Sequence, residues 1–317
     1  MHYLVTGGAG FIGSHLVEAL VARDDQVTVL DDFSTGREAN LAAVAGRIRV
    51  VRGSVADDAA VVDALTGVDQ VVHLAAAVGV RKIMEDRVDG IRTNVQGSET
   101  VFVACARRGL PLFLASTSET YGKNTAVPFR EDADSVLGPT GLHRWSYACA
   151  KLLDEFLALA YFHEHRLPVV VARFFNVTGP RQCPDYGMVL PRFCQAALAG
   201  GALEVHGSGQ QSRCFLHVED CVAAILLLLD CPAAIGEVVN IGSGEETTIQ
   251  ALAERVIARV GRGTLRRIPY ATAFPEGGFE DMQRRVPDTG KLTRLTGWHR
   301  RHDLDATIAD ALRWAGT

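Results

Sequence analysis

The sequence predicts an α/β fold: a doubly wound parallel sheet in the N-terminal part and a smaller, interleaved lobe in the C-terminal part. Three observations predict this fold. Short apolar segments alternate with helical segments over residues 1–176, as in a parallel sheet covered on both faces. A glycine-rich turn directly follows the first apolar segment. Over residues 177–317 the alternation breaks and the segments become shorter, with returns to the main sheet near residues 212–240.

The composition is that of an ordinary globular protein. The chain has 317 residues, of which 48% are hydrophobic and 22% charged, and its formal net charge is −5. Because no long basic run occurs, we expect neither nucleic acid nor an anionic membrane as a partner. The longest apolar run, residues 221–229, is too short to span a membrane. The first residues enter a strand directly, without the pattern of a signal peptide.

The seven cysteines include no C-x-x-C pair. Most of them lie among apolar residues. We therefore expect reduced, buried thiols in a cytoplasmic protein, and no metal site.

Six strands are expected, each a short apolar segment before a turn or a helix. They cover residues 2–6, 26–30, 47–51, 68–74, 110–116 and 168–174. Helical segments separate them, one beginning near residue 11, a long one over about residues 84–108, and one over about residues 146–165. Ligands of such a sheet bind at the carboxyl ends of its strands.

The first turn carries Gly7, Gly10 and Gly13 in a G-x-x-G-x-x-G run. Glycine suits this turn because the backbone must bend tightly and bring main-chain N–H groups close to a pyrophosphate. The positive end of the following helix, at Phe11 and Ile12, faces the same group. The run therefore predicts a dinucleotide site.

The second strand leads into Asp31 and Asp32, about 20 residues after the glycines. A carboxylate at this point accepts hydrogen bonds from the adenosine ribose and repels a 2′-phosphate, which favours NAD over NADP. Asp31 is the expected main contact. For Asp32, a second ribose contact and a loop carboxylate in water are equally open.

The third helical segment carries Tyr147 and Lys151, four residues apart. At this spacing both side chains lie on one helix face. An ammonium near a phenol lowers the pKa of the phenol, so Tyr147 is a candidate general base with Lys151 as its partner.

Three segments together resemble one known family. They are the glycine run at residues 5–13, the Ser/Thr-rich strand end at residues 114–122 and the Tyr147–Lys151 pair. In this order they resemble the extended short-chain dehydrogenase/reductase family of NAD-dependent nucleotide-sugar epimerases, dehydratases and decarboxylases, over nearly the whole chain. UDP-glucuronate 4-epimerases and UDP-glucuronate decarboxylases are the most similar members. The resemblance implies a Rossmann sheet, a tightly held NAD and a UDP-sugar bound by the C-terminal lobe.

For NAD, the resemblance implies contacts at the ends of further strands. Ser54 and Val55 lie where the family has its adenine pocket. Small residues after the fourth strand let the cofactor lie across the strand ends, and the residues concerned are Leu74, Ala75 and Ala76. Tyr147 and Lys151 also contact the cofactor, Lys151 through the nicotinamide ribose.

For catalysis, the resemblance implies that Thr117 orients the sugar 4-hydroxyl while Tyr147 removes its proton and the C4 hydride goes to the nicotinamide. Without the Tyr147–Lys151 pair, a Ser/Thr cluster at a strand end would be ascribed to hydrogen bonds with loop backbone. Glu119 is a further candidate catalytic residue, and bracing of the loop is its other interpretation.

For the substrate, the resemblance implies contacts mainly from the C-terminal lobe. Asn176 belongs to an R-x-x-N-x-x-G-P-x segment that touches the nucleotide diphosphate or the sugar. Arg213 and Arg285 match diphosphate-binding arginines, whose planar guanidinium suits phosphate. The remaining candidates are Ser118 beside the catalytic threonine, Val189 and Arg192 near the hexose, Glu204 and His206 at the uracil pocket, and Asp288 at a ribose.

Two residues bear on the reaction. Arg192 matches a cation of epimerases that act on UDP-glucuronate, where it would hold the C6 carboxylate; a surface or phosphate-binding arginine is its other interpretation. Glu119 matches a glutamate of UDP-glucuronate decarboxylases. Dehydratases of the family have an Asp-Glu pair, and Ser118 occupies the aspartate position, which argues against dehydration.

We expect a UDP-sugar 4-epimerase that converts UDP-glucuronate to UDP-galacturonate. UDP-glucose 4-epimerase and UDP-glucuronate decarboxylase are the enzymatic alternatives, and an NAD-binding sensor or scaffold is the alternative from another class. Relatives pair the helices near residues 85–108 and 146–165 between subunits. Because the second of these helices is apolar on more than one face, we expect a homodimer.

Overall fold

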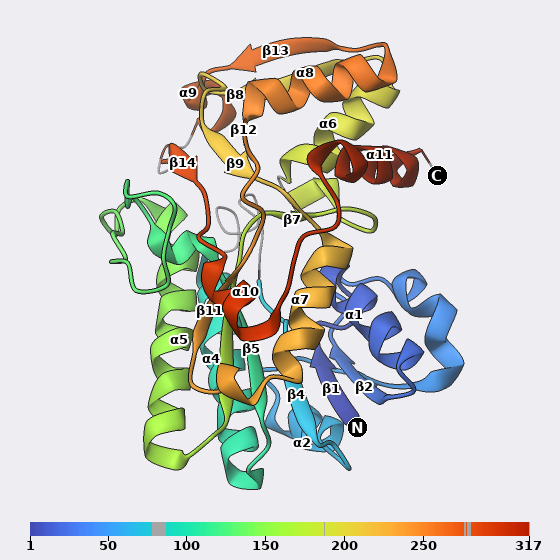
Figure 1. Cartoon of the computed structure of the whole chain (residues 1–317), viewed down its shortest axis with the longest axis vertical. Helices are drawn as coiled ribbons and strands as arrows, with labels where there is room; N and C mark the ends of the chain where they lie inside the picture. Colours follow the sequence, from blue (N-terminus) through green and yellow to red (C-terminus); the bar gives the residue numbers. More distant parts are fainter. Residues whose placement is uncertain (78–86, 187, 276, 278–279, 317) are drawn as a thin grey trace.

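The computed structural model describes residues 1–77, 87–186, 188–275, 277 and 280–316. In this part of the chain, seven strands form one parallel sheet in the order β11-β6-β5-β4-β1-β2-β3 (Figure 1). The strands are β1 (His2–Thr6), β2 (Gln26–Asp31), β3 (Ile48–Arg52), β4 (Gln70–His73), β5 (Leu112–Thr117), β6 (Val169–Phe174) and β11 (Val238–Ile241). The prediction of a doubly wound parallel α/β fold is confirmed.

The sheet is buried on both faces because successive side chains of each strand point to opposite sides. In β1, Tyr3 and Val5 belong to the apolar core on one face, and Leu4 belongs to the core on the other. Each of these three side chains is at most 1% exposed. Burial of one such side chain contributes about 1.5–3 kcal/mol to stability.

Two groups of helices cover the two faces. The core that contains Tyr3 and Val5 is closed by α1 (Phe11–Ala22), α7 (Val218–Leu229) and α10 (Gly290–Thr296). The core that contains Leu4 is closed by α2 (Asp58–Ala64), α4 (Arg87–Arg108) and α5 (Ser146–His165). Because α7 and β11 lie in this half, the chain returns to the sheet after it has entered the second lobe.

The second lobe, in the upper half of Figure 1, has a core of its own. It contains α6 (Val189–Leu198), β8 (Ala202–His206), α8 (Ile249–Val260), β13 (Thr264–Ile268) and α11 (Leu304–Ala315). Small sheets connect the two halves: β9 (Ser212–Cys214) pairs with β12 (Glu246–Thr248) and β14 (Arg284–Arg285), and β7 (Val177–Thr178) pairs with β10 (Leu216–His217). A short helix, α9 (Tyr270–Ala273), follows β13.

Short 3₁₀ segments complete the described chain. They are η1 (Glu38–Arg47), η2 (Ser118–Tyr121), η3 (His143–Trp145), η4 (Pro184–Tyr186) and η5 (Pro232–Ala234). The six predicted strands are present within two residues at each end, and the helix predicted over residues 146–165 has those bounds. The predicted start of the long helix, near residue 84, lies outside the described residues.

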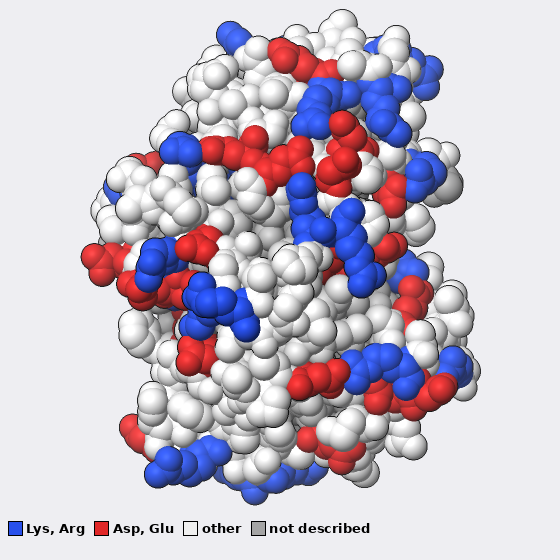
Figure 2. All heavy atoms as spheres, in the orientation of Figure 1, with Lys and Arg blue, Asp and Glu red and all other residues white. Residues whose placement is uncertain are grey.

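The surface shows no strong segregation of charge. On the face in Figure 2, basic and acidic side chains are interspersed over both halves of the molecule. The seven cysteines are free thiols, and Cys105, Cys194, Cys214 and Cys221 are buried. Within the residues the structure describes, no helix has the length and apolar character needed to cross a membrane.

Candidate active site

A cavity of about 2210 Å³ lies where the carboxyl ends of the strands face the second lobe. A pocket for one small ligand usually measures about 300–1,000 Å³. This cavity therefore has room for a dinucleotide and a nucleotide sugar together. Its position agrees with the rule for open α/β sheets, whose ligands bind outside the carboxyl ends of the strands.

Most of the predicted site residues line this cavity. From the sheet half they are Gly7, Gly10, Phe11, Ile12, Gly13, Asp31, Asp32, Ser54, Val55, Leu74, Ala75, Ala76, Thr117, Ser118, Glu119 and Tyr147. From the segments after β6 they are Asn176, Val189, Arg192, Glu204, His206, Arg213 and Arg285.

Two predicted residues, Lys151 and Asp288, are not among the described residues that line the cavity. Lys151 is 2% exposed and lies in the interior of α5. Asp288 accepts a hydrogen bond of 2.7 Å from the backbone N–H of Gly290, so its carboxylate caps the turn into α10.

The glycine turn fits a pyrophosphate. Gly7 has φ +68°, and a side chain there would come within 2.9 Å of the backbone nitrogen of Ala75. A side chain at Gly13 would lie 2.2 Å from the carbonyl oxygen of Gly7, so only glycine lets α1 pack this closely on the turn. No side chain caps α1 and its first turn holds no acidic residue, which leaves its positive end open to an anion.

The two aspartates after β2 differ in their surroundings. Asp31 is buried, and its two oxygens accept from the backbone N–H groups of Ala9 (2.9 Å) and Phe33 (2.8 Å). Burial raises the pKa of Asp31, and these two hydrogen bonds oppose the rise. Asp32 is exposed, and its Oδ1 accepts from the backbone N–H of Ser34 (2.8 Å). Asp31 therefore fixes the backbone of the loop at this end of the cavity.

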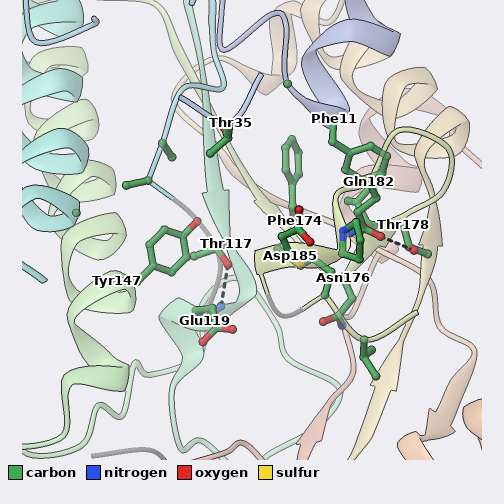
Figure 3. A pocket seen from close by; sticks show the side chains of 18 of the residues that line it. Phe11, Thr35, Thr117, Glu119, Tyr147, Phe174, Asn176, Thr178, Gln182 and Asp185 are labelled. Atoms are coloured by element: carbon green, nitrogen blue, oxygen red, sulfur yellow. Dashed lines mark hydrogen bonds between the residues drawn. The ribbon is translucent and has the colours of Figure 1, made fainter. Parts of the chain in front are cut away.

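Thr117 and Tyr147 face each other across one wall of the cavity (Figure 3). Thr117 ends β5, and Tyr147 lies in the first turn of α5. Burial raises the pKa of Tyr147, the carboxylates of Glu119 and Asp154 raise it further, and a hydrogen bond with Thr117 lowers it. A lowered pKa was predicted for Tyr147 because of Lys151, and this prediction is wrong.

Burial is the largest cause of the raised pKa of Tyr147, and Lys151 makes an ion pair of its own. Its Nζ donates to Oδ2 of Asp154 over 2.9 Å, and both side chains are almost fully buried. The positive charge of Lys151 is therefore balanced by the carboxylate of Asp154, one helical turn further along α5. Asp154 was not predicted as part of the site, although its i+3 spacing from Lys151 is visible in the sequence.

Glu119 lies between two arginines. Arg144 of η3 and Arg285 of β14 each approach one of its carboxylate oxygens to 2.5 Å. Burial alone would raise the pKa of Glu119, but the two arginines outweigh it and lower this pKa to about 2. Glu119 is thus a firmly ionised carboxylate beside Thr117 and Tyr147.

Arg285 joins this group to Asn176. It donates to Oδ1 of Asn176 over 2.5 Å, and the amide nitrogen of Asn176 donates to the carbonyl of Cys214 over 3.0 Å. Asn176 is held at φ +36°, a left-handed conformation that asparagine tolerates better than most residues. In Figure 3, Asn176 lies across the cavity from Thr117, Glu119 and Tyr147.

Arg213 is buried and makes most of its hydrogen bonds within the protein. It is 6% exposed and donates to Asp281 (2.6 Å) and to the carbonyl oxygens of Ser212 (2.7 Å) and Met282 (2.8 Å). Burial lowers its pKa, and Asp281 opposes that change.

Arg192 lies with the residues predicted for the nucleobase. Its Nη2 is 3.5 Å from Oε2 of Glu204, whose other oxygen pairs with Arg266. Burial lowers the pKa of His206, and the positive charge of Arg192 lowers it further. His206 also meets the ring of Phe274 edge to face, with centroids 5.8 Å apart.

A group of possible metal ligands lies at the start of α7. His217, Glu219 and His302 offer ligand atoms within 4.8 Å of one another. However, Nδ1 of His217 accepts from the backbone N–H of Glu219 over 3.2 Å, so the proton of the neutral ring lies on Nε2. A metal ion would need a lone pair on Nε2 of His217, but this nitrogen carries the proton and lies 3.5 Å from Oδ2 of Asp310. We interpret this group as a helix cap that joins α7 to α11.

Comparison with known proteins is consistent with this geometry. UDP-N-acetyl-alpha-D-glucosaminuronate decarboxylase of Bacillus cytotoxicus is 38% identical over 313 residues, which cover 98% of this chain and 96% of that protein. UDP-glucuronic acid decarboxylase 1 of Danio rerio is 35% identical over 298 residues, 93% of this chain and 68% of that protein. The crystal structure of UDP-glucuronic acid 4-epimerase from Bacillus cereus, in complex with UDP-glucuronic acid and NAD, has a TM-score of 0.89 and 27% identity, and covers 100% of this chain and 99% of that chain.

The model of the NAD dependent epimerase/dehydratase family matches residues 3–242. This range contains the glycine turn, Thr117, Tyr147 and Lys151. The chain therefore belongs to the NAD dependent epimerase/dehydratase family, and it is an enzyme with NAD as its cofactor.

Proposed function

We propose that this enzyme oxidises a UDP-hexuronic acid at C4 and then removes its C6 carboxylate as carbon dioxide. The observation that carries the proposal is the ionised Glu119, held by Arg144 and Arg285 beside Thr117 and Tyr147. The names of the two curated relatives, a UDP-N-acetylglucosaminuronate and a UDP-glucuronate decarboxylase, support it. The substrate class therefore includes both the 2-hydroxy and the 2-acetamido uronic acids.

NAD, when bound, takes up a hydride from C4 and later returns one to the same carbon. Gly7, Gly10 and Gly13 with the start of α1 would hold its pyrophosphate, and Asp31 and Asp32 its adenosine end. Tyr147 removes the proton of the 4-hydroxyl, while Thr117 positions that hydroxyl. The product of this step is a 4-keto sugar whose C6 carboxylate is β to the ketone.

The carboxylate then leaves as carbon dioxide. The C5–C6 bond breaks, and its electron pair moves into the enolate of the 4-ketone. A proton from water reaches C5, and reduction of the ketone at C4 returns the proton on Tyr147 to O4. Glu119 is ionised and does not supply the proton at C5. Glu119, Arg144 and Arg285 together carry a net charge of +1, which attracts the carboxylate of the substrate without binding it as strongly as two free arginines would.

The contacts of Arg192 favour decarboxylation over epimerisation. The sequence suggested that Arg192 holds the C6 carboxylate, which would keep the carboxylate from turning perpendicular to the ketone plane. Arg192 instead pairs with Glu204, a residue expected at the nucleobase, and its positive charge lowers the pKa of His206, which is expected at the same place. We therefore assign Arg192 to the nucleotide end of the substrate.

Epimerisation of UDP-glucuronate to UDP-galacturonate is the second candidate. It is favoured by the similarity to the Bacillus cereus 4-epimerase and by Arg192, which remains 34% exposed at the cavity. UDP-glucose epimerisation ranks below it because such a substrate has no carboxylate for the positive group around Glu119. Dehydration ranks last because Ser118 cannot act as the acid that an aspartate would provide.

We further propose a homodimer that forms through α4 and α5. Three apolar side chains are exposed on these helices and are not among the described residues that line the large cavity: Ile91 (43%), Leu153 (49%) and Phe156 (67%). The two helices run side by side along one outer edge of the molecule (Figure 1). A second copy of the same surface would cover these side chains.

Two variants test the reaction. Glu119→Gln removes the negative charge between Arg144 and Arg285, and we expect the rate of decarboxylation of UDP-glucuronate to fall about 100-fold or more. Arg192→Ala should raise the KM for UDP-glucuronate, and the variant should still release carbon dioxide. Glu246→Gln is the matched control, because Glu246 also pairs with an arginine, Arg284, but does not line the cavity.

Product mass and the C4 coupling in proton NMR distinguish the outcomes. Decarboxylation that is unaffected in Glu119→Gln contradicts the role of this residue. UDP-galacturonate as the main product of the wild-type enzyme, lost in Arg192→Ala, would establish the epimerase instead.

A further inference from the structure

The ammonium of Lys151 makes a contact that the proposed reaction does not require. Its Nζ donates to Oδ2 of Asp154 over 2.9 Å, three residues further along α5. The two side chains are 2% and 1% exposed. Lys151 is therefore held in a buried ion pair whose net charge is zero. It is not among the described residues that line the cavity.

A chain of hydrogen bonds reaches Asp154 from the sheet. Ser98 of α4 donates its hydroxyl proton to Oδ2 of Asp154 over 2.9 Å. Because the hydroxyl proton of Ser98 already binds Asp154, Ser98 Oγ must be the acceptor in its 3.2 Å hydrogen bond with His73, and Nε2 of His73 is the donor. Nδ1 of His73 is then an acceptor, and the Thr6 hydroxyl donates to it over 2.8 Å. Thr6 accepts in turn from the backbone N–H of Ala75, at the cavity wall, over 3.2 Å.

The donors in this chain all point toward Asp154, which fixes it as a carboxylate. Burial raises the pKa of Asp154, and Lys151 and Ser98 oppose the rise. Burial and the neighbouring Lys151 lower the pKa of His73 to about 3, so the histidine is neutral. Oδ1 of Asp154 is buried and has no hydrogen-bond partner within the described structure, so Lys151 and Ser98 hold the carboxylate by Oδ2.

We propose that Asp154 is a positioning residue: by holding the Lys151 ammonium in this buried pair, it limits the action of Lys151 on Tyr147 and so sets the pH at which Tyr147 acts as a base. The inference deepens the proposed reaction, in which Tyr147 is the base. It does not depend on which sugar is the substrate.

Within the described part of the chain, charged groups from several elements face these two residues. Tyr147 faces Glu119 of η2, Arg144 of η3, the Thr117 hydroxyl of β5 and, on its own helix, Asp154. Asp154 faces Lys151 and Glu155 of α5 and Ser98 of α4, with the neutral His73 of β4 behind Ser98. Asp154 raises the pKa of Tyr147 and also pairs with Lys151, so it acts on both members of the Tyr147–Lys151 pair.

Titration of Tyr147 itself tests the proposal. A difluorotyrosine placed at position 147 has a more acidic phenol, and its ionisation can be followed by fluorine NMR in the NAD-bound protein without a sugar. Asp154→Asn keeps the shape of the side chain and removes its charge. We expect the midpoint of the titration to fall by about one pH unit or more, because Lys151 then acts on the phenolate without a competing carboxylate.

Glu155→Gln is the matched control. Glu155 is the next residue of α5, is also buried and pairs with Arg173 over 2.7 Å, so its loss also removes a buried ion pair but leaves Lys151 untouched. In Glu155→Gln, the midpoint of the titration at position 147 should equal that of the protein with the native Glu155. If Asp154→Asn fails to fold, Asp154→Ser removes the same charge, and the same fall is expected.

An unchanged midpoint in the Asp154 variant overturns the proposal, and so does an equal fall in Glu155→Gln. Because the titration contains no sugar, its result is separate from the test of the reaction. An enzyme that fails to act on a UDP-hexuronic acid contradicts the proposed function alone.

Discussion

At the residue scale, Tyr147 should control how the rate depends on pH. Its pKa is raised by burial and by the Glu119 and Asp154 carboxylates, and only the phenolate can accept the proton of the sugar. The ionised fraction therefore grows as pH rises. We expect the rate of the first C4 oxidation to rise about tenfold per pH unit from about pH 6 to pH 8.

A single-turnover experiment measures this dependence through the near-ultraviolet absorbance of the reduced nicotinamide. Tyr147→Phe is the control, and its residual rate should not follow the same curve. A wild-type rate that is independent of pH over this range would show that the phenolate is already formed, contrary to the surroundings of Tyr147.

Also at the residue scale, the sequence predicts single positions better than their partners. Tyr147 and Lys151 could be recognised because their spacing within one helix is a local pattern. The contact between Arg285 and Glu119 joins residues 166 positions apart, so no local pattern reveals it. Arg144 was missed for the same reason, since its role depends on how η3 packs against η2. The pKa of Tyr147 was predicted in the wrong direction because the burial of the phenol and the nearby Glu119 and Asp154 carboxylates depend on the folded structure.

At the element scale, α4 and α5 carry the proposed dimer contact. Phe156→Glu places a charge at the most exposed apolar position of α5, and burial of that charge in an interface is costly. We expect the wild-type protein to sediment as a dimer at micromolar concentration and Phe156→Glu to sediment as a monomer. Leu227→Glu is the matched control, because Leu227 is 40% exposed on α7 and should leave the dimer intact.

A wild-type monomer at micromolar concentration would contradict the dimer. Equal dissociation by Leu227→Glu would show that the effect is not specific to α5.

The elements of the first half could be predicted because their apolar segments are continuous and end at turns. The strand β1 and the helix α5 have the predicted bounds. The 3₁₀ segment η1 was not predicted, although its buried Leu41 and Val44 lie three residues apart, as on one face of a helix. The pairing of β9 with β12 and β14 could not be predicted from the sequence either, because short strands far apart in the chain have no local sequence pattern.

At the scale of the whole molecule, the sequence predicted the doubly wound sheet and the cavity residues of its strand ends. These follow from topology, because parallel strands bring their carboxyl ends to one edge. The sequence could not show that Arg192 pairs with Glu204, because that depends on the arrangement of α6 and β8 in the second lobe. This pair is one reason why we propose decarboxylation in place of the epimerisation expected from the sequence.

The most direct test of the proposed reaction is to run it in deuterated water with UDP-glucuronate and NAD, and to analyse the product by NMR and mass spectrometry. We expect a UDP-pentose that has lost carbon dioxide and carries one deuterium at C5, because solvent supplies the proton there. A product that keeps its carboxylate, has no deuterium at C5 and is inverted at C4 would contradict the decarboxylase and establish a 4-epimerase.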